Sequence, residues 1–227
     1  MIHSRALTIP MLCVALGAPM LSAADFSNYR GMQFGMNLST AAKQAGTNLT
    51  DARTIHQRPA VIQEMDWQPR PPIMANPAKA DPVKDGLLYF VNGELFRIVV
   101  TYDRYKVQGM TAEDMIDGIS ATYGTATKPK AEIAYHSNYG EVATVLARWE
   151  DPQYAYSLVR TGDQTSFAMI LYSKTLEASA QAASAESGRL DLLEAPQREI
   201  EKQKKRDQDE RLVLDQARSV NKLNFRP

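Results

Sequence analysis

Two apolar runs flank an Asn-Gly pair in the stretch Leu87–Val100, and they predict a β-hairpin. A type I′ turn needs positive φ at both central residues, which Asn92-Gly93 tolerates. A two-residue loop also fixes the register of the two strands. It pairs Val91 with Glu94, Tyr89 with Phe96 and Leu87 with Ile98 on one face, and Phe90 with Leu95 and Leu88 with Arg97 on the other. Both faces are largely apolar, so we expect a cover on each side of the hairpin, from a helix, a distant segment or a partner.

The rest of the first half predicts short elements around this hairpin. Turn and capping residues divide it into segments. We expect a strand at Met32–Met36, a helix capped by Asn37 or Ser39 and ended by Gly46, helical turns at Leu49–Arg58 capped by Thr50, a strand at Val61–Trp67, and an extended surface loop at Pro69–Pro82. The proline-rich stretch Arg70–Pro82 is also compatible with a polyproline ligand.

The second half repeats this order. Thr111 and Asp114 form the pattern of a capping box, and Gly124 ends the helix that they begin. Three strands follow, at Val142–Trp149, Tyr154–Arg160 and Phe167–Ser173. The sequence therefore predicts an α+β fold of two αβββ units with antiparallel sheets, the first at residues 25–108 and the second at residues 109–174.

Residues 175–227 predict a C-terminal helical arm, rich in Ala, Glu, Lys and Gln. Pro196 is expected to kink or break it. Its first part, Leu176–Leu193, has the apolar and small residues to cover the second face of the sheet. The middle is polar all round, which is typical of a helix that crosses solvent. Apolar residues return near the end and either dock back or bind elsewhere, but they sustain no heptad, so no coiled coil is predicted: Leu212, Leu214, Val220, Leu223 and Phe225.

The charge balance, the N-terminal segment and the single cysteine indicate where the protein is located in the cell. The chain has 26 basic and 26 acidic residues among 227, so nothing favours binding to nucleic acid. Residues 1–24 have the pattern of a secretory signal peptide, with Arg5 before an apolar run and cleavage after Ala24 or Ala23; an uncleaved anchor is the alternative. Without Arg5 the mature chain carries 25 basic and 26 acidic residues, a net charge of −1. The single cysteine, Cys13, lies in this leader without a lipoprotein motif, so we expect no lipid anchor, no disulfide and no thiolate metal site.

No common catalytic motif is present in the sequence. Outside the leader, His56 and His136 have no partner at a metal-binding spacing, and a helix-end position explains His56. Asp66 and Glu150 each adjoin a tryptophan, and apolar surroundings can raise the pKa of a carboxyl group; solvated strand-end charges are the simpler interpretation. Four aromatic residues suit either a sugar or peptide platform or core packing: Trp67, Trp149, Tyr154 and Tyr156. No catalytic, cofactor-binding or metal residue is assigned, and no cofactor is expected.

Two segments give the chain a family resemblance over Met32–Ser173. In each of them, Phe34–Gly46 and Gly109–Gly124, a helix ended by glycine is followed by strands. It resembles the tandem outer-membrane assembly lipoproteins and the β-lactamase-inhibitor-like modules. This resemblance implies protein binding through one sheet face, without an active site. The chain departs from the pattern because it lacks a lipid-anchoring cysteine and adds charged C-terminal helices. It also looks like secreted bacterial proteins for which the resemblance implies no activity.

The sequence thus predicts an exported, periplasmic or secreted protein that acts as a non-catalytic protein-binding or cell-envelope assembly module. Its expected partner is another envelope protein, with no nucleic acid and no integral membrane segment after removal of the leader. The alternative is a hydrolase or carbohydrate-acting enzyme that uses dispersed carboxylates. A structural protein of the envelope without a single partner is a third interpretation.

Overall fold

The computed structural model describes residues 24–69, 81–129, 133–136, 142–160 and 166–226. The predicted signal peptide, apart from Ala24, and most of the predicted loop at Pro69–Pro82 lie outside these residues. The elements of the described part are the strands β1 (Asn28–Tyr29), β2 (Met32–Gln33), β3 (Arg53–His56), β4 (Ile62–Trp67), β5 (Val83–Val91), β6 (Glu94–Tyr102), β7 (Ile133–His136), β8 (Val142–Glu150), β9 (Tyr154–Arg160) and β10 (Phe167–Ser173), the 3₁₀-helix η1 (Leu49–Asp51), and the helices α1 (Leu38–Ala45), α2 (Ala112–Tyr123) and α3 (Lys174–Asn224).

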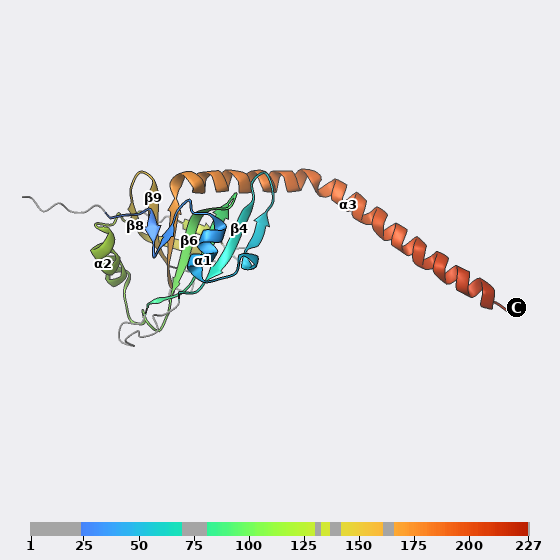
Figure 1. Ribbon diagram of the computed structural model, residues 1–227, viewed down its shortest axis with the longest axis horizontal. Helices are drawn as coiled ribbons and strands as arrows, with labels where there is room; N and C mark the ends of the chain where they lie inside the picture. Colours follow the sequence, from blue (N-terminus) through green and yellow to red (C-terminus); the bar gives the residue numbers. More distant parts are fainter. Residues whose placement is uncertain (1–23, 70–80, 130–132, 137–141, 161–165, 227) are drawn as a thin grey trace, which may run out of the picture.

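Among the described residues, eight antiparallel strands form one twisted sheet in the order β3-β4-β5-β6-β10-β9-β8-β7 (Figure 1). Each half of the chain supplies a helix followed by a four-stranded meander, and the last strands of the two meanders, β6 and β10, pair in the centre. The α+β class is confirmed. Each unit has four strands rather than three, because β3 and β7 add an outer strand at each edge of the sheet.

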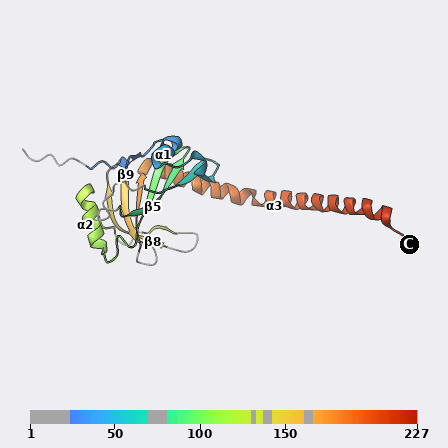
Figure 2. The same ribbon diagram turned by 60° about the horizontal axis from the view of Figure 1, so that its bottom comes forward.

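One sheet face, called here the first face, carries the main core beneath α1 and α2. Asn37 caps α1 through a hydrogen bond from the Thr40 backbone N–H (2.8 Å), and the left-handed Gly46 ends it. The predicted capping box of Thr111 and Asp114 is confirmed at the start of α2. Figure 2 shows α2 beside the β8 end of the sheet and α1 over the other half. The largest fully buried side chains of this core are Trp149, Tyr156, Phe90, Met32, Met65, Leu88, Leu95, Ile98, Leu158, Met169, Leu171 and Val100.

The opposite face, called the second face, is crossed diagonally by the first part of α3, which contacts β5, β6 and β10. Ala180 is buried there with Phe96, Val91 and Ile62, and the half-buried Leu176 packs against this cluster. Small residues let the helix approach the sheet closely. The expectation that the hairpin is covered on both faces is confirmed on the first face by α1 and the N-terminal segment, and only in part on the second, where α3 covers Val91 and Phe96.

One of the expected elements is wrong. Leu49–Arg58 forms only one 3₁₀ turn and then the strand β3, because its residues Arg53–His56 extend the sheet against β4. The expectation that Pro196 kinks or breaks the C-terminal helix is confirmed as a bend without a break: α3 runs through Pro196 to Asn224, and Figure 1 shows the helix bending where it leaves the sheet. Beside the proline, the Arg198 guanidinium donates to the Asp191 carbonyl oxygen (2.8 Å) and carboxylate (3.0 Å).

An ion pair ties the N-terminal hairpin β1–β2 to the start of β5. Arg30 lies in the turn of this hairpin with φ of 54°, and its guanidinium donates two hydrogen bonds to the Asp81 carboxylate, one of them 2.9 Å long. Asp81 also accepts from the Val83 backbone N–H at 2.9 Å. The hydrogen bond from Arg30 lowers the pKa of Asp81, although partial burial opposes this effect.

This lowered pKa predicts a contribution to stability that depends on pH. The folded pKa lies below the unfolded value, so the contribution is complete above about pH 4 and is lost as the pH falls through the folded pKa. We expect Asp81→Asn to lower the melting temperature by about 2 °C at pH 7, since the pair is partly exposed. The melting temperatures of the two proteins should converge as the pH falls through the lowered folded pKa of Asp81; a difference that stays constant with pH would exclude this role of the carboxylate.

Candidate binding groove on the second face

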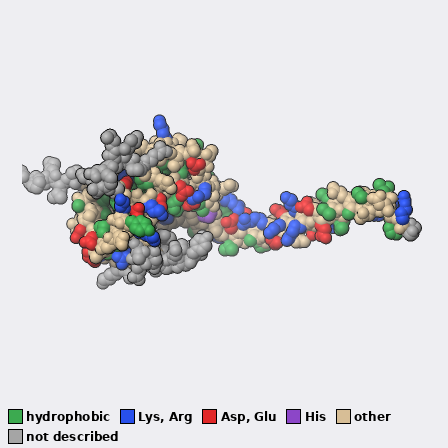
Figure 3. Space-filling model, turned by 90° about the horizontal axis from the view of Figure 1, so that it is seen from below, with side chains coloured by type: hydrophobic (Ala, Val, Ile, Leu, Met, Phe, Trp, Pro, Cys, Tyr) green, Lys and Arg blue, Asp and Glu red, His purple; other side chains and the backbone are tan. Residues whose placement is uncertain are grey.

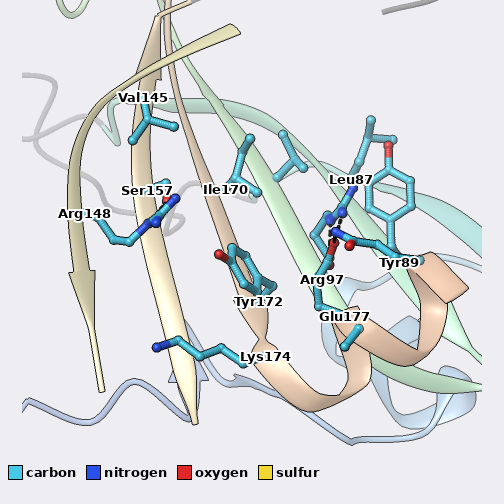
Figure 4. Close-up of a pocket in the computed structure, with 13 residues that line it drawn as sticks. Leu87, Tyr89, Arg97, Val145, Arg148, Ser157, Ile170, Tyr172, Lys174 and Glu177 are labelled. Atoms are coloured by element: carbon cyan, nitrogen blue, oxygen red, sulfur yellow. Dashed lines mark hydrogen bonds and ion pairs between the residues drawn. The ribbon is translucent and has the colours of Figure 1, made fainter. Parts of the chain in front are cut away.

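The part of the second face that α3 leaves uncovered forms a groove of about 620 Å³. Its floor crosses five neighbouring strands, from β5 to β8, and the first turns of α3 form one wall. Figure 4 shows Leu87, Tyr89 and Arg97 on one side, with Val145, Arg148 and Ser157 across from them. The lining joins branched apolar side chains with tyrosines and cations, and includes Leu87, Tyr89, Arg97, Val99, Val145, Arg148, Ser157, Ile170, Tyr172, Lys174 and Glu177.

A β-bulge at Phe96 positions the groove's central arginine. Asn92 and Gly93 have positive φ (50° and 84°), as the type I′ prediction requires, and the pairs Val91–Glu94 and Phe90–Leu95 are confirmed. Beyond them the register shifts by one residue. The predicted pairs are wrong from this point on: Tyr89 lies opposite Arg97, Leu88 opposite Ile98, and Leu87 opposite Val99.

The extra residue has a structural role, because it places two consecutive side chains on the second face. Phe96 packs against α3 and Arg97 lines the groove. The signal was present in the sequence. Leu95 and Ile98 both enter the main core, and strict alternation cannot place residues three positions apart on one face.

Arg97 is held by α3. Its guanidinium donates two hydrogen bonds to the Glu177 carboxylate, one of them from Nε to Oε2 at 2.9 Å. Glu177 is only 6% exposed, and it also accepts from the Gln181 side-chain amide at 2.7 Å. The Arg97 guanidinium lies 5.8 Å from the Tyr89 ring centroid and 5.6 Å from that of Phe96. The arginine is therefore fixed in place, and the carboxylate is committed to an ion pair.

The opposite side of the groove carries further polar contacts. Arg148 Nε donates to the hydroxyl oxygen of Ser157 at 3.2 Å, and this serine is almost fully buried. At the start of α3, Lys174 Nζ forms an ion pair with Glu150 (2.6 Å) and donates to the Asp151 carbonyl oxygen (2.7 Å). The groove therefore brings three cations and one paired carboxylate to an apolar floor. This arrangement suits the binding of apolar and acidic groups.

The structure does not bring the two candidate carboxylates together. Asp66 on β4 and Glu150 on β8 are five strand spacings apart in the sheet, or about 24 Å. Each already has a partner: Asp66 lies 3.2 Å from Arg53, and Glu150 pairs with Lys174. The enzyme alternative therefore loses the pair of carboxylates that motivated it.

The aromatic residues follow the core-packing interpretation. Trp67, Trp149 and Tyr156 are buried beneath the first face, and the half-buried Tyr154 stacks on Phe34 with ring centroids 5.6 Å apart. The Tyr156 hydroxyl lies 3.1 Å from the carbonyl oxygens of Phe26 and Asn28, and burial raises its pKa above the ordinary value for tyrosine. These rings hold the N-terminal segment on the core and do not form a binding platform.

Of the two histidines outside the leader, the structure describes a side-chain contact for His56. His56 lies on β3 rather than at a helix end, and its Nδ1 is 3.2 Å from the hydroxyl of Ser187 on α3. His136 belongs to β7, and its side chain lies outside the described part of the structure. Among the described residues, no group of three or more His, Cys, Asp or Glu side chains could hold a metal ion.

Beyond the sheet, α3 becomes an arm. The last contacts with the body are ion pairs of Arg58 with Glu194 and with Asp191, the latter at 3.5 Å. From Pro196 to Asn224 the helix is exposed and extends about 44 Å at a rise of 1.5 Å per residue. Of the two alternatives for its apolar end, docking back or binding elsewhere, the described residues therefore do not show docking onto the body. Figure 3 shows charges of both signs along the arm and hydrophobic side chains toward its end.

Comparison with known proteins gave no match to a protein-family model, to a curated protein or to a solved structure. In the described residues, no helix is long and apolar enough to cross a membrane.

Proposed function

We propose that this protein is an exported, non-catalytic module that binds another protein of the cell envelope through the groove on the second face. The observation that carries the proposal is the lining of the groove. It combines Tyr89 and Tyr172 with Arg97 and Arg148 over an apolar floor. Tyrosine and arginine are the residues enriched where proteins meet, because each joins a large contact area to a polar end.

The shape and charge of the groove indicate which kind of polypeptide segment the partner would place in it. The floor spans five strands, so it offers room for a segment of polypeptide that lies along the wall formed by α3. Arg97 and Lys174 are paired with Glu177 and Glu150. The groove therefore keeps a small excess of positive charge, which favours a segment with some acidic side chains among apolar ones. The proposal of export rests on the leader pattern of residues 1–24.

The test is affinity capture after crosslinking in cells of the native host, quantified by mass spectrometry. Leu87 is half-buried in the groove, and Leu87→Glu places a carboxylate where the partner's apolar and acidic groups would bind. We expect this variant to reduce the captured partner at least about tenfold, as a loss of about 1.4 kcal/mol does.

The matched control is Leu49→Glu, which makes the same substitution at a side chain that is 52% exposed and remote from the groove lining. This control should capture the partner as the unchanged protein does. Equal capture by both variants, with both folded as judged by circular dichroism, would exclude the groove as the binding surface.

A further inference from the structure

The last turns of α3, Arg211–Asn224, and the two residues that follow them form an amphipathic segment, called here the tip (Arg211–Arg226). With about 3.6 residues per turn, Leu212, Leu223, Val220 and Val213 fall within about 100° of one another around the helix axis. These four side chains are 56–78% exposed, and together with the intervening Gln216 they form a mainly apolar stripe that no other described residue covers.

The net positive charge of the arm lies in the tip. Residues 197–210 carry five basic and five acidic side chains, whereas the tip carries four basic residues against Asp215 alone. Arg211, Arg218 and Lys222 lie on the side of the helix opposite the apolar stripe, and the exposed Leu214 lies at the edge of that basic side. A short helix with an apolar stripe and a basic opposite side is the pattern of a segment that lies in the interface of an anionic membrane.

From this charge and geometry we infer that the tip binds the surface of an anionic phospholipid membrane. The stripe would enter the boundary between headgroups and acyl chains, while the long side chains of Arg218 and Lys222 reach outward to the lipid phosphates. The tip is too short to span a bilayer, since the helix from Arg211 to Asn224 measures about 20 Å. It therefore lies along the surface.

A second copy of the chain is a poorer occupant for the tip. The groove offers an apolar floor, but the one described carboxylate in its lining, Glu177, is already paired with Arg97, so the groove gives a cationic segment no opposite charge to bind. The tip begins about 22 Å beyond Pro196 along the helix and ends about 44 Å beyond it, so the tip can meet a surface without steric interference from the body. The inference does not depend on what the groove binds.

The experiment is flotation of the full-length mature protein with vesicles. Vesicles of phosphatidylglycerol mixed with phosphatidylcholine should retain the protein, vesicles of phosphatidylcholine alone should retain at least about tenfold less, and added salt should weaken the binding. The variant Val220→Gln/Leu223→Gln should lose most of the binding, and so should Arg218→Gln/Lys222→Gln. Both pairs are exposed, so the folded body is unaffected.

The control is Ile200→Gln, which removes an exposed apolar side chain from the arm outside the tip and should bind the anionic vesicles normally. Absence of vesicle binding, equal binding to both vesicle types, or full binding by the tip variants would each overturn the inference. A partner captured in cells through the tip, without vesicle binding, would also overturn it. The tip variants should leave capture through the groove unchanged, which separates this test from that of the proposed function.

Discussion

A protein that ends at Ser173 is expected to be largely unfolded or aggregated, because the second face would lose its cover. Ile62, Val91 and Phe96 are each buried to 5% exposure or less under α3. Re-exposing three such side chains costs about 5 kcal/mol, which is comparable to the whole stability of many domains. The truncation also removes Glu177 and leaves Arg97 on the face without its carboxylate. Thermal melting and size-exclusion chromatography would measure the loss.

A second truncation tests whether the loss of stability comes from the part of α3 that covers the sheet rather than from the exposed arm. A chain that ends after Arg198 keeps the described contacts of α3 with the sheet and with Arg58, but removes the exposed arm. We expect its stability to lie within about 0.5 kcal/mol of the full chain. If the protein that ends at Ser173 melted at the same temperature as this longer truncation, the covering role of α3 would be refuted.

Replacement of Trp149 by alanine is expected to lower the free energy of unfolding by about 4 kcal/mol. Trp149 is 1% exposed in the main core. Its indole N–H lies 3.0 Å from the Gly124 carbonyl oxygen and 3.2 Å from the Ser120 hydroxyl, so it also fixes the end of α2 to the sheet. The substitution leaves a large cavity and removes this attachment.

Urea unfolding of three variants separates these effects. Trp149→Phe keeps most of the apolar volume but loses the N–H donor, so it should cost about 2 kcal/mol. Leu49→Ala, at an exposed site, should cost less than about 0.5 kcal/mol. A Trp149→Ala protein as stable as Leu49→Ala would contradict the place of this tryptophan in the core.

Local rules predicted much of the fold. Asn92-Gly93 specified its turn, Asn37 and Thr111 specified helix starts, and Gly46 a helix end, because the backbone conformation at these positions depends on the residues themselves. The strands Tyr154–Arg160 and Phe167–Ser173 have the predicted bounds. The burial of Trp67 and Trp149 decides between the platform and the core packing that the sequence left open.

Other features depend on contacts between distant residues. The pairing of β6 with β10, which merges the two halves into one sheet, joins segments about 70 positions apart and leaves no local pattern. The strands Arg53–His56 and Ile133–His136 are short edge strands whose partners define them. The groove collects side chains from five strands and a helix, so no spacing in the sequence indicated it. Only the broken alternation around Phe96 pointed to part of it.

The most direct test of the central claim is site-specific photo-crosslinking in the native host. A photoreactive phenylalanine at Tyr172 would lie in the groove, and one at Tyr105, 70% exposed and outside the groove lining, would serve as the control. We expect a single discrete adduct with another envelope protein from position 172 and none from position 105. If position 172 gave no adduct, or both positions gave the same one, the groove would not be the surface that binds a protein partner.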